Sequence, residues 1–183
     1  MKHRIVELTE NNLVQAPEWD SRPFSCKWCL YWEHPELLID PKKEKKEEVF
    51  QRKLAWLRRV QKEFGECGKL LYVGQEAVGY AQYAPARFLP NAAAYPAGPA
   101  SKDAVLISCL FIAREEYRRQ GLGTLLLEEI LSELQRRGIT AAETFARLGG
   151  AENPSGPVEL YLKHGFHVFR DDEEFPLMRL VLE

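Results

Sequence analysis

The chain has 183 residues and a mass of 21.1 kDa, which suits one domain, or one domain with a short arm. Lys plus Arg number 25 and Asp plus Glu number 27, a balance that gives no electrostatic support for a nucleic-acid-binding or membrane-coating protein. The four cysteines are too few for a disulfide scaffold. No run reaches the ~18 apolar residues of a membrane span. Residues 1–10 lack the apolar core of a secretory signal, so we expect a cytoplasmic protein.

Cys26 and Cys29 have the CxxC spacing of half a zinc site. A second CxxC or HxxxH pair is missing from the sequence, and nothing in the spacing brings Cys67 or His34 close to them. We therefore expect partly buried thiols and no metal, with a zinc-stapled interaction domain as the alternative.

The first half of the chain predicts a strand, a helix and a hairpin. Residues 4–8 predict the strand. Asp40-Pro41 predicts the start of a helix, and apolar residues follow at helical spacing from Phe50 to Phe64. Residues 70–83 predict a hairpin, and residues 20–39 an irregular, aromatic-rich segment. Residues 85–103 contain four prolines, which exclude a helix interior or a central strand. This loop is either functional or a surface excursion.

The second half predicts a parallel strand pair joined by a helix. Residues 104–113 form an unbroken apolar run, typical of a strand buried on both faces. Residues 121–137 predict an amphipathic helix, and residues 139–146 predict a second strand. A strand–helix–strand order favours a parallel pair with a crossover. A short helix over 159–164 and an antiparallel pair, 166–169 with 176–182, complete an α/β chain with a mixed sheet.

The segment RRQGLGT, residues 118–124, lies between the buried strand and the long helix. First helical turns usually carry acids, because the free N–H groups form a positive end. Here the first acids are Glu128 and Glu129, while two arginines and two glycines precede them. Bare amides beside positive charge suit a phosphate or a diphosphate. The alternative is that Arg118 and Arg119 are ordinary surface charges.

Two phosphate-binding motifs fit this loop poorly. The Walker string GxxxxGK[ST] does not occur in the sequence. For the dinucleotide fingerprint GxGxxG, Gly121 and Gly123 fit, but the third position is Leu126. Glu143 has the spacing of a ribose-binding acid, yet the link from Ala113 to the helix is too long for that motif's tight turn.

The six residues RRQGLG (118–123) match [QR]-x-x-G-x-[GA], the pyrophosphate motif of the GNAT superfamily of N-acetyltransferases, which the chain therefore resembles. The segment LYLKHGF (160–166) is similar to that family's L-Y-x-x-x-G-F signature. The resemblance implies a single domain over residues 1–183, with 10–65 as a variable acceptor-side region. The implied fold class is α/β: a central mixed, mostly antiparallel sheet with one splayed parallel pair, flanked by about four helices.

The resemblance also implies acetyl-CoA as co-substrate and transfer of its acetyl group to an amine by direct attack, with no metal. The implied coenzyme-binding residues are Phe111, Ile112, Ala113, Arg118, Arg119, Gln120, Gly121, Leu122, Gly123, Thr124 and Asn153. Tyr161 is the implied general acid, since a phenol is protonated at neutral pH and can donate to a departing thiolate. The structural alternative for Tyr161 is a core tyrosine. A buried Cys109 is a poor nucleophile.

The sequence does not single out one general base or one acceptor. Base candidates are Glu33, Glu115, Glu116 and Glu143, or a chain of waters. Residues 19–34 and 85–103 are expected to shape the acceptor pocket, with Trp28, Tyr31, Trp32, Phe88 and Tyr95 as candidate lining. The acceptor is a small-molecule or peptide amine, with no nucleic-acid or membrane partner expected. A non-catalytic acyl-CoA sensor on the same fold is the alternative function.

Overall fold

The computed structural model describes residues 2–19, 25–39, 45–149 and 152–183. Within these ranges, strands form one sheet in the order β1-β2-β3-β4-β5-β7-β6. The strands are β1 (His3–Glu7), β2 (Gly68–Val73), β3 (Glu76–Pro85), β4 (Val105–Ile112), β5 (Ala141–Phe145), β6 (His167–Arg170) and β7 (Leu177–Val181). Neighbours are antiparallel except β4 and β5, which are parallel. The predicted mixed sheet with one parallel pair is confirmed.

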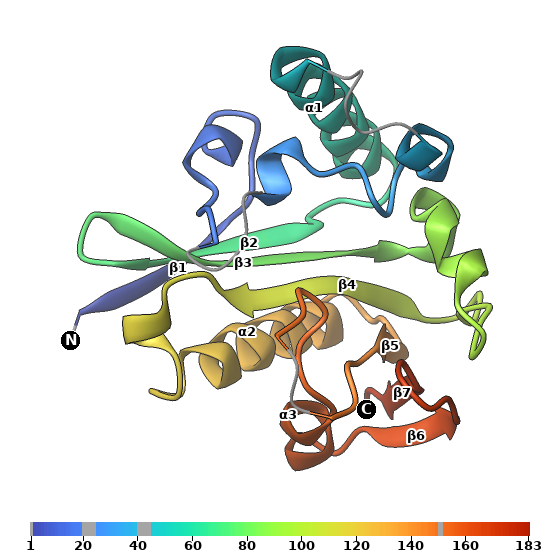
Figure 1. Ribbon diagram of the computed structural model, residues 1–183. Coiled ribbons are helices and arrows are strands. Elements are labelled where there is room, and N and C mark those ends of the chain that lie inside the picture. The colour runs from blue at the N-terminus through green and yellow to red at the C-terminus, as the bar shows by residue number, and fades with distance from the viewer. Residues whose placement is uncertain (1, 20–24, 40–44, 150–151) are drawn as a thin grey trace.

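Helices cover both faces of the sheet (Figure 1). On one face lie α1 (Lys46–Glu63) and the short 3-10 helices that precede it. On the other lie α2 (Leu122–Arg136) and α3 (Val158–Lys163). The described ranges thus hold three α-helices, and the expectation of about four is wrong. The described residues of 13–19 and 25–39 form only short 3-10 helices, at Leu13–Gln15, Cys26–Trp28 and Pro35–Ile39, because these segments lack the continuous apolar repeat of an amphipathic helix.

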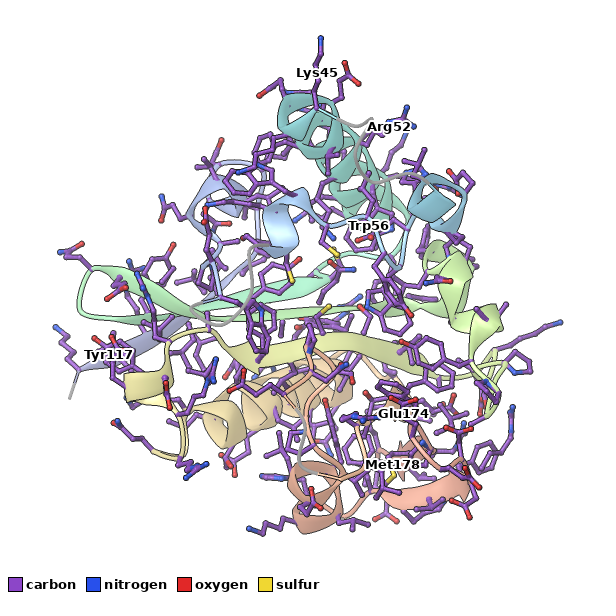
Figure 2. All side chains as sticks on the ribbon, viewed as in Figure 1. Lys45, Arg52, Trp56, Tyr117, Glu174 and Met178 are labelled. Atoms are coloured by element: carbon purple, nitrogen blue, oxygen red, sulfur yellow. The ribbon has the colours of Figure 1, made fainter. Side chains whose placement is uncertain are left out.

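Helix α1 begins later than the sequence indicates. The predicted cap Asp40 and first-turn Pro41 lie outside the described residues. The N-cap of α1 is Lys45, which has an extended backbone and projects from the end of the helix in Figure 2. Trp56 lies on the side of α1 that faces the sheet (Figure 2), and its ring N–H donates to the Phe88 carbonyl at 2.7 Å. No helix in the described ranges is long and apolar enough to cross a membrane.

The loop over 85–103 packs into the molecule. Its first part forms two 3-10 helices, Ala86–Phe88 and Pro90–Ala94. The ring of Tyr95 then stacks on Phe145, the last residue of β5, with ring centroids 4.3 Å apart. It also stacks on Trp32 at 5.2 Å. Of the two expectations for this loop, the free surface excursion is therefore wrong.

The parallel pair β4–β5 separates after two residues. Val105 lies beside Ala142 and Leu106 beside Glu143, and the pairing then stops. On its other edge, β4 changes register against β3, with one extra residue, Ser108, between the partners of Tyr83 and Gln82. A bulge of this kind bends the strand that carries it. The bend accompanies an opening between the second half of β4 and β5, and residue 154 lies against β4 there.

Candidate active site

The N-terminus of α2 is open and uncapped. Its N-cap, Gly121, has φ = 80°, no side chain caps the helix, and its first turn contains no acid. A Cβ added at Gly121 or Gly123 would find no neighbouring atom within 4 Å. The first helical amides have no partner within the helix, so Leu122, Gly123 and Thr124 direct N–H groups and the positive end of the helix dipole toward this open space. The arrangement suits an anion, as the sequence predicts.

The two arginines of this loop have different positions. The Arg118 side chain turns inward: its Nε donates to the Ile112 carbonyl at 3.0 Å and a terminal nitrogen to the Ala113 carbonyl at 2.9 Å. It also forms an ion pair with Glu152. Arg119 is exposed and has φ = 58°, in the left-handed region that non-glycine residues seldom adopt. Arg118 therefore ties the loop to the end of β4, and only Arg119 presents its charge to solvent at the loop.

The amides of β4 alternate between its two neighbours. Ala113 donates to the Val78 carbonyl of β3 at 2.8 Å, so every second amide along this part of the strand faces β3. Phe111 shares that side, whereas Ile112 faces the opening toward β5. Leu110 also faces the opening, and its N–H donates to the Pro154 carbonyl at 2.7 Å. Of the predicted residues 111–113, only Ile112 therefore directs its amide into the opening.

Tyr161 is fully buried in α3. Its hydroxyl donates to the Ser155 carbonyl at 2.7 Å. Burial raises the pKa of Tyr161 above its usual range, because the charged phenolate would lose its hydration. The phenol is thus protonated at neutral pH, as a proton donor must be. Gly156 is required beside it: its φ is 78°, and a Cβ there would lie 3.2 Å from the Tyr161 hydroxyl.

Asn153 lies in the same turn but faces its own backbone. Its side-chain oxygen accepts the Ser155 N–H at 3.0 Å and the Ser155 hydroxyl at 2.8 Å. This oxygen therefore closes the turn that holds Pro154 against β4. In Figure 1 the orange segment between β5 and α3 reaches toward β4. The structure thus brings Asn153, Tyr161 and the opening together.

The four candidate base residues differ in burial and in hydrogen-bond partners. Glu115 and Glu116 are exposed. Glu143 is fully buried, but Arg179 and Ser101 satisfy both of its oxygens at 2.6–2.7 Å. Glu33 is buried too, pairs with Lys53 through Oε1, and keeps its Oε2 free of any hydrogen-bond partner in the described ranges.

Three of the five candidate aromatic residues gather over the end of β5. The Trp32 ring stacks on Tyr95, and its centroid lies 6.5 Å from that of the Phe145 ring. The Tyr31 and Tyr95 hydroxyl oxygens are 3.2 Å apart. Trp28 instead contacts lysine ammonium groups, and Phe88 packs beneath α1.

A cavity of about 620 Å³ lies on the α1 face. Its lining residues are Val14, Gln15, Ala16, Pro17, Glu18, Trp19, Lys27, Tyr72, Gln75, Glu76, Ala77 and Arg114. Trp19 packs on Phe111 with ring centroids 4.6 Å apart, which places the cavity beside the end of β4. Sequence reasoning missed it, because its walls come from three distant segments with no shared motif.

The two CxxC cysteines are free thiols that differ in burial. Cys26 is buried, and Cys29 is half-buried. Burial raises the pKa of Cys26, and it raises the pKa of Cys29 to about 11. Within the described residues, no three Cys, His, Asp or Glu side chains gather as a metal site. Burial of the two thiols disfavours their charged form.

Comparisons with known proteins identify the family and similar folds. Residues 68–168 match the family model described as an acetyltransferase (GNAT) domain. No curated protein sequence matches the chain at a significant level. The fold is similar to that of PaiA N-acetyltransferase from Thermoplasma acidophilum in complex with coenzyme A, with 14% identity over 99% of each chain and a TM-score of 0.58.

Two further structures share the fold. The ribosomal-protein-S18-alanine N-acetyltransferase of Escherichia coli has 15% identity and a TM-score of 0.54, covering 100% of this chain and 95% of its own. A GNAT family acetyltransferase of Brucella melitensis, in complex with acetyl-CoA, has 13% identity and a TM-score of 0.55, covering 100% of this chain and 89% of its own. The family model spans more than half of the sequence, and the chain belongs to the GNAT acetyltransferase family.

Proposed function

We propose that this protein is an N-acetyltransferase that transfers the acetyl group of acetyl-CoA to the amine of an acceptor by direct attack, with both substrates bound together. The observation that carries the proposal is the uncapped N-terminus of α2, where Gly121 and Gly123 leave open space over bare amides. A diphosphate fits this space, because its oxygens accept from the amides and its charge meets the positive end of the helix.

The residues around the opening fit the rest of the co-substrate. The backbone of 119–124 would hold the diphosphate, and the exposed Arg119 adds positive charge. The Ile112 and Leu110 amides face the opening toward β5, where they could bind the pantetheine arm and the thioester oxygen. Such preorganised amides stabilise the negative charge that develops on a carbonyl oxygen during attack. Two structural relatives were solved with coenzyme A or acetyl-CoA, which supports this assignment.

Tyr161 supplies the proton for the leaving group. When the amine nitrogen bonds to the thioester carbon, the carbon–sulfur bond breaks and a thiolate forms. Burial keeps the Tyr161 phenol protonated. Tyr161 can therefore donate its hydroxyl proton to the thiolate and recover a proton from the new amide nitrogen. No thiol of the chain is required to carry the acetyl group, and burial raises the pKa of both Cys26 and Cys29.

A non-catalytic acyl-CoA sensor is the second candidate, and one observation favours it. The Leu110 N–H and the Tyr161 hydroxyl, the two groups that would meet the thioester, donate instead to the carbonyls of Pro154 and Ser155. An enzyme must release both groups during turnover. A sensor could keep both hydrogen bonds.

The test is a screen for amine-dependent thiol release from acetyl-CoA. The library contains alkyl amines, aryl amines, amino acids and peptides with free N-termini. The proposal predicts thiol release above the background hydrolysis rate for at least one class, with the acetylated amine identified by mass. Binding of acetyl-CoA without transfer to any amine would favour the sensor, and absence of binding would contradict both.

A further inference from the structure

A buried polar network lies on the α1 face of the sheet. Lys53 of α1 forms an ion pair with Glu33, and its ammonium also donates to Gln82 Oε1 at 2.6 Å. Gln82 Nε2 donates to Glu33 Oε1 at 2.8 Å, and the Tyr80 hydroxyl donates to Gln82 Oε1 at 2.8 Å. The side chains of Glu33 and Gln82 and all of Tyr80 are fully closed to solvent. The coenzyme-binding groups do not use this network.

One atom of the network is unsatisfied. Glu33 Oε1 accepts two hydrogen bonds, whereas Oε2 is buried and has no partner in the described part of the chain. A buried carboxylate oxygen without a donor is unfavourable and seldom retained without a purpose. Glu143 shows the contrast, since a side chain or backbone donor satisfies each of its oxygens. Glu33 Oε2 is therefore suited to accept from a donor that a ligand brings.

The network lies beside the point where β4 and β5 separate. Gln82 is paired with Cys109, the residue that follows the bulge at Ser108. On the other side, the neighbour of Glu33 in the chain, Trp32, approaches Phe145 at the end of β5. The side chains of Cys109 and Phe145 both belong to the core on the α1 face. Glu33 thus lies over β3, beside β4, on the face opposite Tyr161.

Cysteines surround the charged pair. The ionisable groups that face Glu33 and Lys53 are Cys26, Cys29, Cys67, Tyr80 and Cys109. Burial raises the pKa of Cys29 to about 11 and that of Cys67 to about 12, so these neighbours are neutral near pH 7. Burial alone would lower the pKa of Lys53, but its interactions with Glu33, Cys29 and Cys26 together outweigh burial, and the pKa of Lys53 is raised. Glu33 supplies the carboxylate of this network, and its Oε2 has no partner among the described residues.

Resting on the proposed function, we propose that Glu33 is the catalytic proton acceptor for the acceptor amine. The substrate ammonium gives one proton to Oε2 of the carboxylate, and the neutral amine attacks the thioester carbon. The nitrogen–carbon bond forms, the carbon–sulfur bond breaks, and Tyr161 passes the second amine proton to the leaving thiolate. Lys53 and Gln82 hold the carboxylate by Oε1, which leaves Oε2 for the amine. Because the Glu33 side chain is closed to solvent in this structure, its proton passes to water that enters as the product leaves.

The test compares Glu33→Gln with Glu36→Gln, an exposed carboxylate three residues away. The acceptors are benzylamine, which is protonated at pH 7, and aniline, which is not, or the best-accepted library amine of each class. For Glu33→Gln we expect a loss of about 10²–10⁴-fold with the protonated acceptor at pH 7. With this acceptor, the difference in rate between Glu33→Gln and wild type becomes smaller toward pH 10, where the amine deprotonates unaided. With the uncharged acceptor the loss is under 10-fold. Glu36→Gln leaves both rates unchanged.

The proposal would be overturned if Glu33→Gln lost the same factor in rate with both acceptor classes at all pH values. Full activity of Glu33→Gln would also overturn it and would mark Oε2 as a site for a buried water. Acetyl-CoA affinity, measured by calorimetry, is expected to be unchanged and shows that the fold is retained. If the single variant Glu33→Gln fails to fold, the double variant Glu33→Gln/Lys53→Met is used in the same assay, because it removes both buried charges. Wild-type protein inactive on every amine would contradict the proposed function instead.

Discussion

The carbonyl oxygen of Pro154 accepts the Leu110 N–H at 2.7 Å, in the opening between β4 and β5. If the thioester binds there, this hydrogen bond must break. We therefore predict that acetyl-CoA changes the ¹⁵N–¹H resonance of the Leu110 amide strongly. The Ala113 amide, which donates to Val78 of β3, is the internal control and is expected to move little. A Leu110 resonance that stays fixed at saturation would show that the thioester lies elsewhere.

Substitution of Arg118 is expected to lower stability, whereas substitution of Arg119 is expected to lower acetyl-CoA affinity. Arg118→Ala removes hydrogen bonds from a charged group to two backbone carbonyls, so the free energy of unfolding should fall by about 1.5–3 kcal/mol. Arg119→Ala removes an exposed charge, so stability is unchanged and acetyl-CoA affinity falls by about 2–5-fold at low salt, less at high salt. Urea denaturation and calorimetry measure the two effects. Interchanged phenotypes would refute the assignment.

Tyr161→Phe removes the proton donor and one buried hydrogen bond. We expect kcat to fall by about 10²–10⁴-fold, while the affinity for acetyl-CoA stays within a few-fold. Stability should fall by about 1–3 kcal/mol, because the Ser155 carbonyl loses its buried partner. Steady-state kinetics and denaturation check these values. Undiminished turnover in a folded variant would assign Tyr161 to the core alone.

Asp103 contributes to the pH dependence of stability. Its carboxylate accepts a hydrogen bond from Arg179 at 2.7 Å, and this contact lowers the pKa of Asp103. The unfolded chain therefore binds more protons in acid, so the contribution is complete above about pH 4 and is lost as the pH falls through the folded-state pKa. Asp103→Asn should lose less stability than wild type between pH 5 and pH 3. Equal losses would contradict this pairing.

Local sequence patterns predicted most of the elements. Unbroken apolar residues in β4, the apolar stripe of α2 and the glycine before it are signals within one segment, and each lies within two residues of its predicted place. The start of α1 was predicted too early. Asp40-Pro41 has the composition of a helix start but lies outside the described residues, and α1 begins at Lys46, after the extended Lys45.

Contacts between distant segments could not be read from the sequence. The bulge at Ser108 determines which β4 amides face the opening. Leu110 was therefore not among the predicted residues, and the Ala113 amide donates to β3 instead of facing the opening. The inward turn of Arg118 depends on carbonyls at the end of β4 and on Glu152. Glu33 could not be singled out from four acids, because its unsatisfied oxygen depends on Lys53 and Gln82.

Calorimetric titration of coenzyme A into wild type and Gly123→Glu tests the central claim most directly. Position 123 has open space, and a glutamate in a first helical turn is favourable in propensity and dipole, so the variant should be about 0.5–1 kcal/mol more stable. Its carboxylate would occupy the diphosphate position, and we predict that binding falls by more than about 100-fold. A stable Gly123→Glu variant with wild-type affinity for coenzyme A would contradict the account.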